Sequence, residues 1–133
     1  MMKNLFQILC GLFLVVSYSS CMHSEEDKVD VLIIGGGASG VTSGIQSARM
    51  GANTLILEES TWLGGMLTSA GVSAVDGNYR LPAGLWGEFK NRLSDYYGGL
   101  DSLKTGWVSN VLFEPSVGNK ILHEMVAAEN NLK

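Results

Sequence analysis

The chain of 133 residues carries 9 lysine and arginine residues against 13 aspartate and glutamate residues, a net charge of −4, and 46% of it is hydrophobic. This length allows one small domain at most, since single domains run to about 100–200 residues. The acidic balance argues against a nucleic-acid partner, which requires a basic surface. Two cysteines are too few for a disulfide scaffold or a four-cysteine metal site. The 17 glycines are the unusual feature of the composition.

Residues 1–20 have the pattern of a signal peptide. Lys3 precedes a run over residues 5–16 that is almost wholly apolar. This run has the length of a signal-peptide core and falls well short of the ~20 residues that span a bilayer. We therefore expect the chain to be exported.

Cys21 follows this core and a stretch of small residues, a pattern that resembles a bacterial lipoprotein signal. In such signals the cysteine is lipidated and becomes the new N-terminus. Tyr18 departs from the pattern, and ordinary secretory cleavage after Ser19 is the alternative. Residues 21–28 are then an acidic tether, and we expect a lipid-anchored protein on the periplasmic or outer-membrane, cell-surface side.

The clearest structural signal is a strand–helix–strand pattern. Residues 29–34 are β-branched and mostly apolar, which predicts a parallel strand buried on both faces. A helical pattern then runs to Met50, and Gly51 suits the left-handed position that closes a helix. Residues 54–57 predict a second buried strand, so the crossover should be right-handed.

The glycine motif Gly35-x-Gly37-x-x-Gly40 lies between the first strand and the helix. The first glycine allows a tight turn, the second lets a pyrophosphate approach the helix N-terminus, and the third permits close packing of helix and strand. Glu58 ends the second strand, where an acidic side chain binds the ribose hydroxyls of an adenosine and repels the 2′-phosphate of NADP. The pattern predicts dinucleotide binding; a glycine turn in an unrelated α/β domain is the alternative.

A second glycine pair, Gly64-Gly65, follows Glu58 within the sequence Trp-Leu-Gly-Gly-Met-Leu-Thr. The segment over residues 31–68 resembles the N-terminal region of the FAD-dependent oxidoreductase family that includes heterodisulfide-reductase-A-like flavoproteins. The likeness is to secreted Bacteroidetes members and continues through residues 74–79 and 107–115. In flavoproteins with two dinucleotide-binding domains, such a glycine pair lies beside the pyrophosphate and ribityl chain of FAD.

This resemblance implies FAD as the cofactor, whereas NAD, the alternative, does not require the glycine pair. Some heterodisulfide-reductase-like relatives hold iron–sulfur clusters through cysteines. No cysteine follows Cys21, so this stretch cannot ligate a cluster, and we expect no metal. The resemblance assigns FAD contacts to nine residues: Gly35, Gly37, Ala38, Ser39, Gly40, Glu58, Gly64, Gly65 and Met66.

The middle of the chain is predicted in less detail. Residues 71–81 suggest a hairpin or short excursion, with Asp76-Gly77 as a turn pair. A helix is predicted over residues 85–97 and a strand over residues 107–113. Asn110 suits a turn or cap, with a flavin contact as the alternative. The helix carries aromatic residues expected in the core, with a substrate or flavin pocket as the alternative: Trp86, Phe89, Tyr96 and Tyr97.

A last helix is predicted to begin at Pro115, which suits the first helical position. His123 lies in this helix without a partner at matching spacing, so we expect no catalytic role for it. Asn130 and Asn131 should close the helix, and residues 132–133 look like the start of another strand.

The fold class expected from these elements is α/β: a Rossmann-like FAD/NAD(P)-binding βαβ start of a larger flavoprotein. Residues 29–133 would then be the N-terminal part of an FAD-binding domain, cut before the sheet is complete. Two functions remain open. The first is an exported FAD-dependent oxidoreductase whose catalytic residues, small-molecule substrate and electron acceptor are unknown. The second is a non-catalytic nucleotide-binding remnant.

Overall fold

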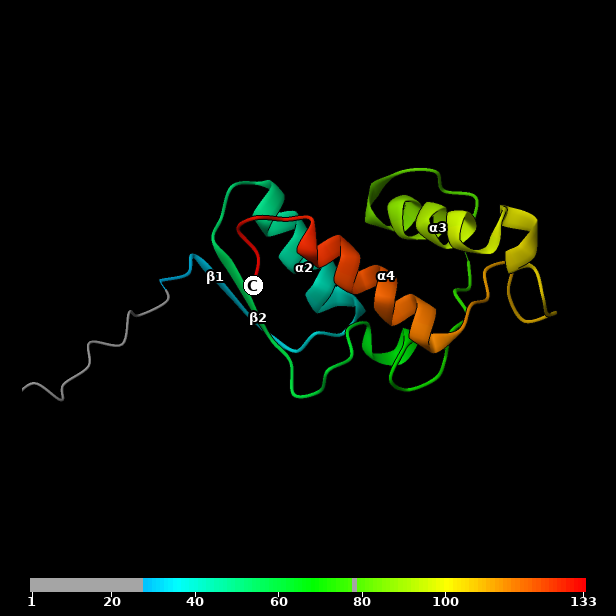
Figure 1. The fold of residues 1–133 in the computed structure, drawn as a ribbon, viewed down its shortest axis with the longest axis horizontal. Coiled ribbons are helices and arrows are strands. Elements are labelled where there is room, and N and C mark those ends of the chain that lie inside the picture. Colours follow the sequence, from blue (N-terminus) through cyan, green and yellow to red (C-terminus); the bar gives the residue numbers. More distant parts are fainter. Residues whose placement is uncertain (1–27, 78) are drawn as a thin grey trace, which may run out of the picture.

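The computed structural model describes residues 28–77 and 79–133 (Figure 1). The predicted signal peptide, Cys21 and residues 21–27 of the tether lie outside the described residues. The elements in chain order are β1 (Val31–Ile34), α2 (Ala38–Arg49), β2 (Thr54–Leu57), the 3₁₀ turn η1 (Gly65–Leu67), α3 (Gly84–Tyr97), the 3₁₀ turn η2 (Leu100–Leu103) and α4 (Pro115–Ala127).

The predicted strand–helix–strand unit is confirmed. β1 and β2 pair in parallel with Val31 opposite Thr54, and α2 connects them and packs on both strands. The helix ends at Arg49 with Met50 as its C-cap, and Gly51 has the left-handed backbone (φ 94°) expected after a helix. β1 begins at Val31, two residues later than the predicted strand.

A third segment joins the sheet beside β2, as the sequence predicts. Leu132 forms a parallel bridge with Thr54, and the amide of Ile56 donates a hydrogen bond to the carbonyl of Lys133 (2.7 Å). Asn131 holds this segment against the end of α2, because its side-chain amide donates to the carbonyls of Ala48 and Ala52 at 2.9 and 2.7 Å. The order of the parallel segments is therefore β1, β2, residues 131–133.

The prediction that both strands are buried on both faces is wrong for the described residues. One face packs against α2, where the side chains of Ile33 and Ile56 lie against Gly44. The opposite face leaves Ile34 75% exposed and Leu57 48% exposed. The strands are apolar on both faces, but within the described residues the helices cover only one.

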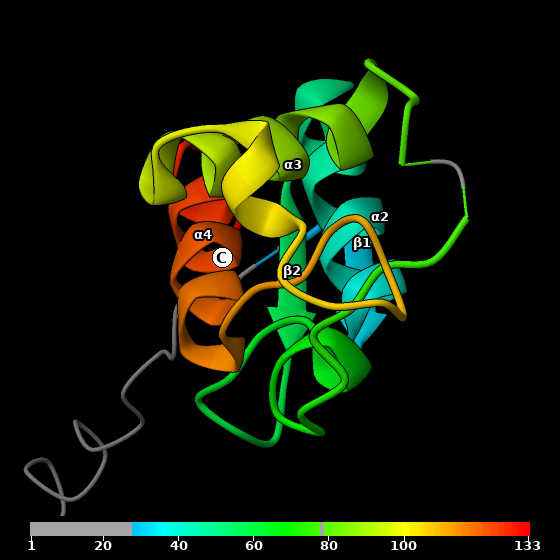
Figure 2. The same cartoon turned by 90° about the vertical axis from the view of Figure 1, so that its right-hand side faces the viewer.

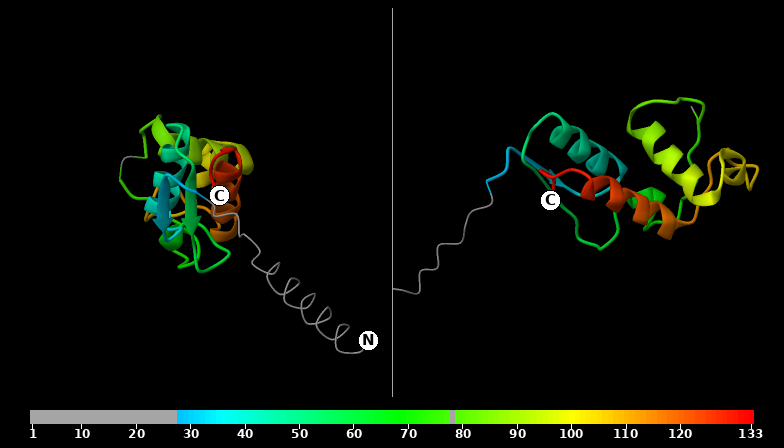
Figure 3. Two further views of the ribbon diagram at one scale, coloured as in Figure 1. Left: turned by 90° about the vertical axis from the view of Figure 1, so that its left-hand side faces the viewer. Right: turned by 45° about the horizontal axis from the view of Figure 1, so that its top comes forward.

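The core lies where α2, α3 and α4 meet. Val41 and Ile45 of α2, Leu93 of α3 and Met125 of α4 are fully buried there. Figures 2 and 3 show α2 and α4 running side by side, and α3 packs against α4. α3 begins one residue before the predicted helix, and α4 begins at Pro115 as predicted.

An ion-pair network joins the three helices at their surface. The guanidinium of Arg49 on α2 contacts Glu88 of α3 at 2.9 Å and Glu129 beyond α4 at 2.7 Å. Arg92 contacts the other oxygen of Glu88 at 3.0 Å. These pairs link helices that are distant in sequence.

The strand predicted over residues 107–113 is wrong. Trp107 is 96% exposed, and Leu112 forms an isolated antiparallel bridge with Ala74. Residues 71–77 are thus the excursion predicted, but in the described part of the chain they pair with the segment before α4 rather than with each other. Gly77 has the left-handed backbone expected of the turn (φ 79°).

The described helices are all too short or too polar to cross a membrane.

Candidate functional site

The turn after β1 has the geometry that its glycines predict. Gly35 has a left-handed backbone (φ 100°) that side chains rarely adopt. A Cβ on Gly40 would lie 2.0 Å from the carbonyl oxygen of Gly35, so the start of α2 sits directly on the turn. No side chain caps α2 at Gly37, and no acidic residue occupies its first turn. The first amides of the helix therefore remain available to an anion.

Glu58 reaches back across this turn from the end of β2. One carboxylate oxygen accepts a hydrogen bond from the amide of Gly36 (2.6 Å), and the other accepts bonds from the amide and hydroxyl of Ser60 (both 3.0 Å). The bonds from the Ser60 and Gly36 amides lower the pKa of Glu58 below its ordinary value. The side chain is thus an oriented carboxylate beside the glycine turn, able to accept further hydrogen bonds.

Gly64 and Gly65 close the other side of the turn. Gly64 forms a parallel bridge with Gly37, and its amide donates to the carbonyl of Gly36 (2.7 Å). A Cβ on Gly65 would lie 3.1 Å from the Cα of Gly37. The three sequence features, the glycine turn, Glu58 and the second glycine pair, are therefore brought together in one place.

Two polar side chains hold the loop that carries this second pair. The buried hydroxyl of Thr68 donates to the carbonyl of Leu63 (2.5 Å), while the side-chain oxygen of Asn119 on α4 accepts from the amide of Leu63 (2.8 Å). Neither residue is among those that the sequence predicts for the site, and Gly36 is not among them either. A Cβ on Gly36 would clash with the side chains of Leu63 (2.7 Å) and Glu58 (3.0 Å).

Gly37 differs from its neighbours. Its backbone is extended (φ −63°, ψ 176°), a conformation open to any residue, and an added Cβ would meet nothing within 4 Å. The chain's own packing therefore does not require a glycine here. The position lies at the uncapped start of α2. This open space is what a bound pyrophosphate requires.

The remaining predicted contacts border the same region. Ala38 and Ser39 form the first turn of α2, with Ser39 exposed. Met66 lies in η1 and is 68% exposed, so its side chain is free to contact a ligand.

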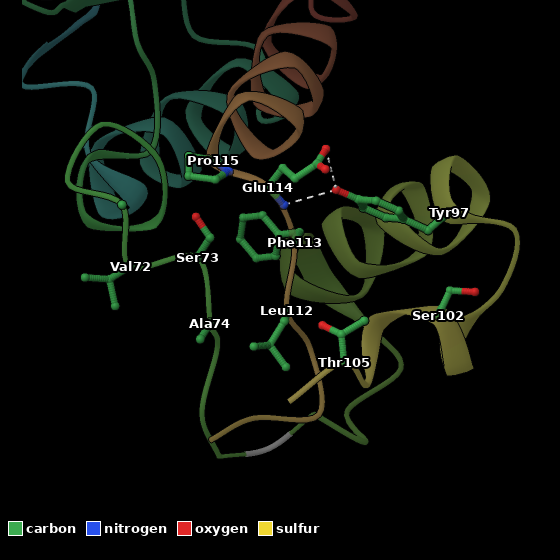
Figure 4. Close-up of a pocket in the computed structure, with 11 residues that line it drawn as sticks. Val72, Ser73, Ala74, Tyr97, Ser102, Thr105, Leu112, Phe113, Glu114 and Pro115 are labelled. Atoms are coloured by element: carbon green, nitrogen blue, oxygen red, sulfur yellow. Dashed lines mark hydrogen bonds between the residues drawn. The ribbon is translucent and has the colours of Figure 1, made fainter. Parts of the chain in front are cut away.

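The aromatic residues of α3 separate into three environments. Phe89 is buried in the core, and Trp86 and Phe89 also line an apolar hollow of about 290 Å³ that reaches Ala38 at the start of α2. Tyr96 is half exposed. Tyr97 accepts a hydrogen bond from the amide of Glu114 (3.0 Å) and donates to its carboxylate (3.3 Å) at the edge of a hollow of about 640 Å³ (Figure 4).

His123 and Asn110 gain no functional partner among the described residues. The His123 ring is exposed, with one nitrogen 3.2 Å from the carbonyl of Thr61, and Asn110 lies in an exposed bend. Within residues 28–77 and 79–133, no three His, Cys, Asp or Glu side chains converge as a metal site would require.

Comparison with known proteins identifies the family. No curated protein matches the chain. The crystal structure of THI4 from Thermovibrio ammonificans matches at 18% identity and a TM-score of 0.44, over 96% of this chain and 45% of that one. This chain therefore spans less than half of the THI4 chain.

The sequence profile described as "FAD dependent oxidoreductase" matches residues 30–133, which is most of the chain. The match confirms FAD, rather than NAD, as the cofactor, and it agrees with the predicted Rossmann-like α/β fold. This chain belongs to the FAD-dependent oxidoreductase family.

Proposed function

We propose that this chain supplies the adenosine- and pyrophosphate-binding part of the FAD site of an oxidoreductase. The observation that carries the proposal is the open space in front of Gly37, at the uncapped start of α2 and bordered by Gly64 and Gly65. In this arrangement the first amides of α2 bind the pyrophosphate, because the helix N-terminus favours an anion. FAD, when bound, supplies the hydride or electron transfer of the reaction.

Glu58 binds the ribose of the adenosine in this proposal. Its carboxylate is already held at the turn by the amides of Gly36 and Ser60, so it loses little freedom when it accepts ribose hydroxyls. Gly64 and Gly65 let the ribityl side of the cofactor lie against the backbone. Ala38, Ser39 and Met66 complete the contacts.

The test is flavin retention by the full-length protein. Gly37→Val places a branched side chain in the open space, so the purified variant should lose its flavin absorbance. Ala83→Val is the matched control, because Ala83 is an exposed residue with an extended backbone at the start of α3. It should keep the flavin of the parent.

Flavin retained by Gly37→Val at the level of the control would contradict the assigned site. A parent protein that purifies without flavin, and takes up none when FAD is added, would instead favour the non-catalytic remnant. Chromatography of the released cofactor distinguishes FAD from NAD.

We also propose that the protein is exported and lipid-anchored through Cys21. The support is the apolar run over residues 5–16 and the cysteine that follows it. Cys21→Ser should move the protein from the membrane fraction to the soluble fraction. An unmodified Cys21 in the mass spectrum of the membrane-derived protein would refute the anchor.

A further inference from the structure

A hollow of about 370 Å³ lies between the loop before α3, α3 itself and the chain after η2. It shares no lining residue with the nine predicted FAD contacts, although Asn110, whose alternative role was a flavin contact, lines it. α3 and η2 form the end of the molecule that faces the viewer in Figure 2. The volume is within the range of small-molecule sites, about 300–1,000 Å³. Five cationic or amide side chains line this cationic hollow: Arg80, Lys90, Asn91, Lys104 and Asn110.

Lys90 is the unusual member, because it is a lysine with only 6% of its surface exposed. Lysines are almost never this buried unless they are paired with a carboxylate. Its ammonium donates to the carbonyls of Tyr79 and Leu81, both at 2.7 Å, and lies 5.8 Å from the ring centre of Trp86. No ion pair among the described residues includes Lys90, so its charge is not neutralised by the protein.

The two other cations add to this excess of positive charge. Arg80 contacts only the hydroxyl and ring of Tyr79, and no described carboxylate pairs with it. Lys104 pairs with the exposed Asp101 at 2.8 Å. That bond raises the pKa of Lys104, while desolvation and, to a smaller extent, the charge of Arg80 oppose the rise. Three cations and one paired carboxylate thus gather on a chain whose net charge is −4.

The amides complete the polar lining. Asn91 and Asn110 have no side-chain hydrogen bond within the described residues, and both line the hollow. A neutral amide beside a guanidinium and an ammonium offers N–H donors to an oxyanion without adding charge. The guanidinium fork of Arg80 matches the paired oxygens of a carboxylate or phosphate.

We propose that this cationic hollow binds a small oxyanion, a carboxylate or phosphate group carried by a metabolite-sized ligand. The hydrogen bonds of Lys90 to the loop carbonyls explain why that lysine is buried. They do not explain why Arg80 and Lys104 line the same space. One bound anion accounts for the two further cations that line this space beside Lys90.

The test uses the FAD-loaded, full-length protein, so that the flavin site is filled. Succinate and inorganic phosphate are titrated separately by calorimetry, with sodium chloride keeping the ionic strength constant. Binding of succinate alone identifies a carboxylate ligand, binding of phosphate alone a phosphate ligand, and binding of both supports the shared oxyanion site.

Arg80→Gln and Lys104→Gln should each raise the dissociation constant of the bound anion about tenfold or more, since each removes a charge-assisted hydrogen bond. Lys120→Gln is the matched control, because Lys120 is an exposed lysine on α4 that contacts Glu124 at 3.9 Å. It removes the same charge outside the hollow and should leave the affinity unchanged. Lys90 is left intact because it holds the loop. Two results would overturn the proposal. One is a heat of anion titration no greater than the heat of diluting sodium chloride. The other is an anion affinity that Lys120→Gln weakens as much as Arg80→Gln and Lys104→Gln do.

Discussion

Gly40→Ala and Gly37→Ala alter two glycines of one motif, and the structure predicts that they fail in different ways. A Cβ at Gly40 would lie 2.0 Å from the carbonyl oxygen of Gly35 and 3.1 Å from its carbonyl carbon. Both atoms belong to the backbone, so relief requires moving the turn or the helix. A Cβ at Gly37 meets nothing within 4 Å and needs no change of backbone.

The magnitudes follow from these contacts. Overpacking a rigid region costs about 1–3 kcal/mol and occasionally more, and a backbone obstacle belongs at the upper end. Alanine returns up to about 1 kcal/mol through its higher helix propensity. Gly40→Ala should therefore lower the free energy of unfolding by about 2 kcal/mol.

At Gly37 the opposing effects nearly cancel. Alanine restricts the unfolded chain and gains about 0.4–1 kcal/mol, but it is a poorer helix N-cap than glycine by a similar amount. Gly37→Ala should thus leave the free energy of unfolding within about 0.5 kcal/mol of the parent. Its new methyl group occupies the space assigned to the pyrophosphate, so flavin should be lost.

The assay is denaturant unfolding of the flavin-free, full-length protein, followed by FAD titration of each variant. An unchanged unfolding free energy for Gly40→Ala would refute the close contact between Gly35 and the start of α2. Parental FAD affinity in Gly37→Ala would refute the ligand-based reason for that glycine. The two variants test the fold and the cofactor site separately.

Two further substitutions test the supports of the site and of the helices. Thr68→Val leaves the carbonyl of Leu63 without its buried hydroxyl partner, so unfolding measurements should show a loss of about 1–3 kcal/mol, with weaker flavin retention. Burial raises the pKa of Glu88, but its bonds to Arg49 and Arg92 outweigh burial and hold that pKa below the ordinary value. The contribution of this network is present above the ordinary carboxyl pKa and is lost as pH falls through the lowered one. Glu88→Gln should cost about 1 kcal/mol or less at neutral pH and reduce the acid dependence of stability, as measured by urea unfolding across pH.

The sequence predicted the strand–helix–strand unit well, because local signals set its boundaries. Apolar periodicity distinguishes the strands from α2, and Gly35 and Gly51 interrupt the chain where its direction changes. The proline at the start of α4 and the glycine after α3 work in the same way. Such boundaries depend on residues within one turn of the change, so they need no knowledge of distant contacts.

Local sequence signals do not predict the structure of the segment around Trp107. Its apolar, β-branched residues favour a strand, but a strand requires a neighbour to pair with over several residues. Only Leu112 forms a ladder bridge, and its partner Ala74 lies in an irregular segment. Pairing is a property of the tertiary structure, and residue composition does not report it.

The site was predictable in its glycines and its acid but not in its supports. Thr68 and Asn119 both bind Leu63, and Asn119 lies 56 residues further along the chain. No spacing rule connects residues at that separation. The cationic hollow is hidden for the same reason, since Arg80, Lys90 and Lys104 follow no common period and meet only when the loop folds over α3.

The glycines of the candidate site differ in whether the chain's own structure requires them. Gly36, Gly40 and Gly64 would each bring a Cβ within 3.0 Å of the chain's own atoms, so folding alone explains them. Gly35 is explained by its left-handed backbone. Gly37 has neither a steric nor a conformational reason to be glycine. This glycine is therefore the one that the proposed FAD site explains, because the uncapped helix start beside it favours an anion such as a pyrophosphate.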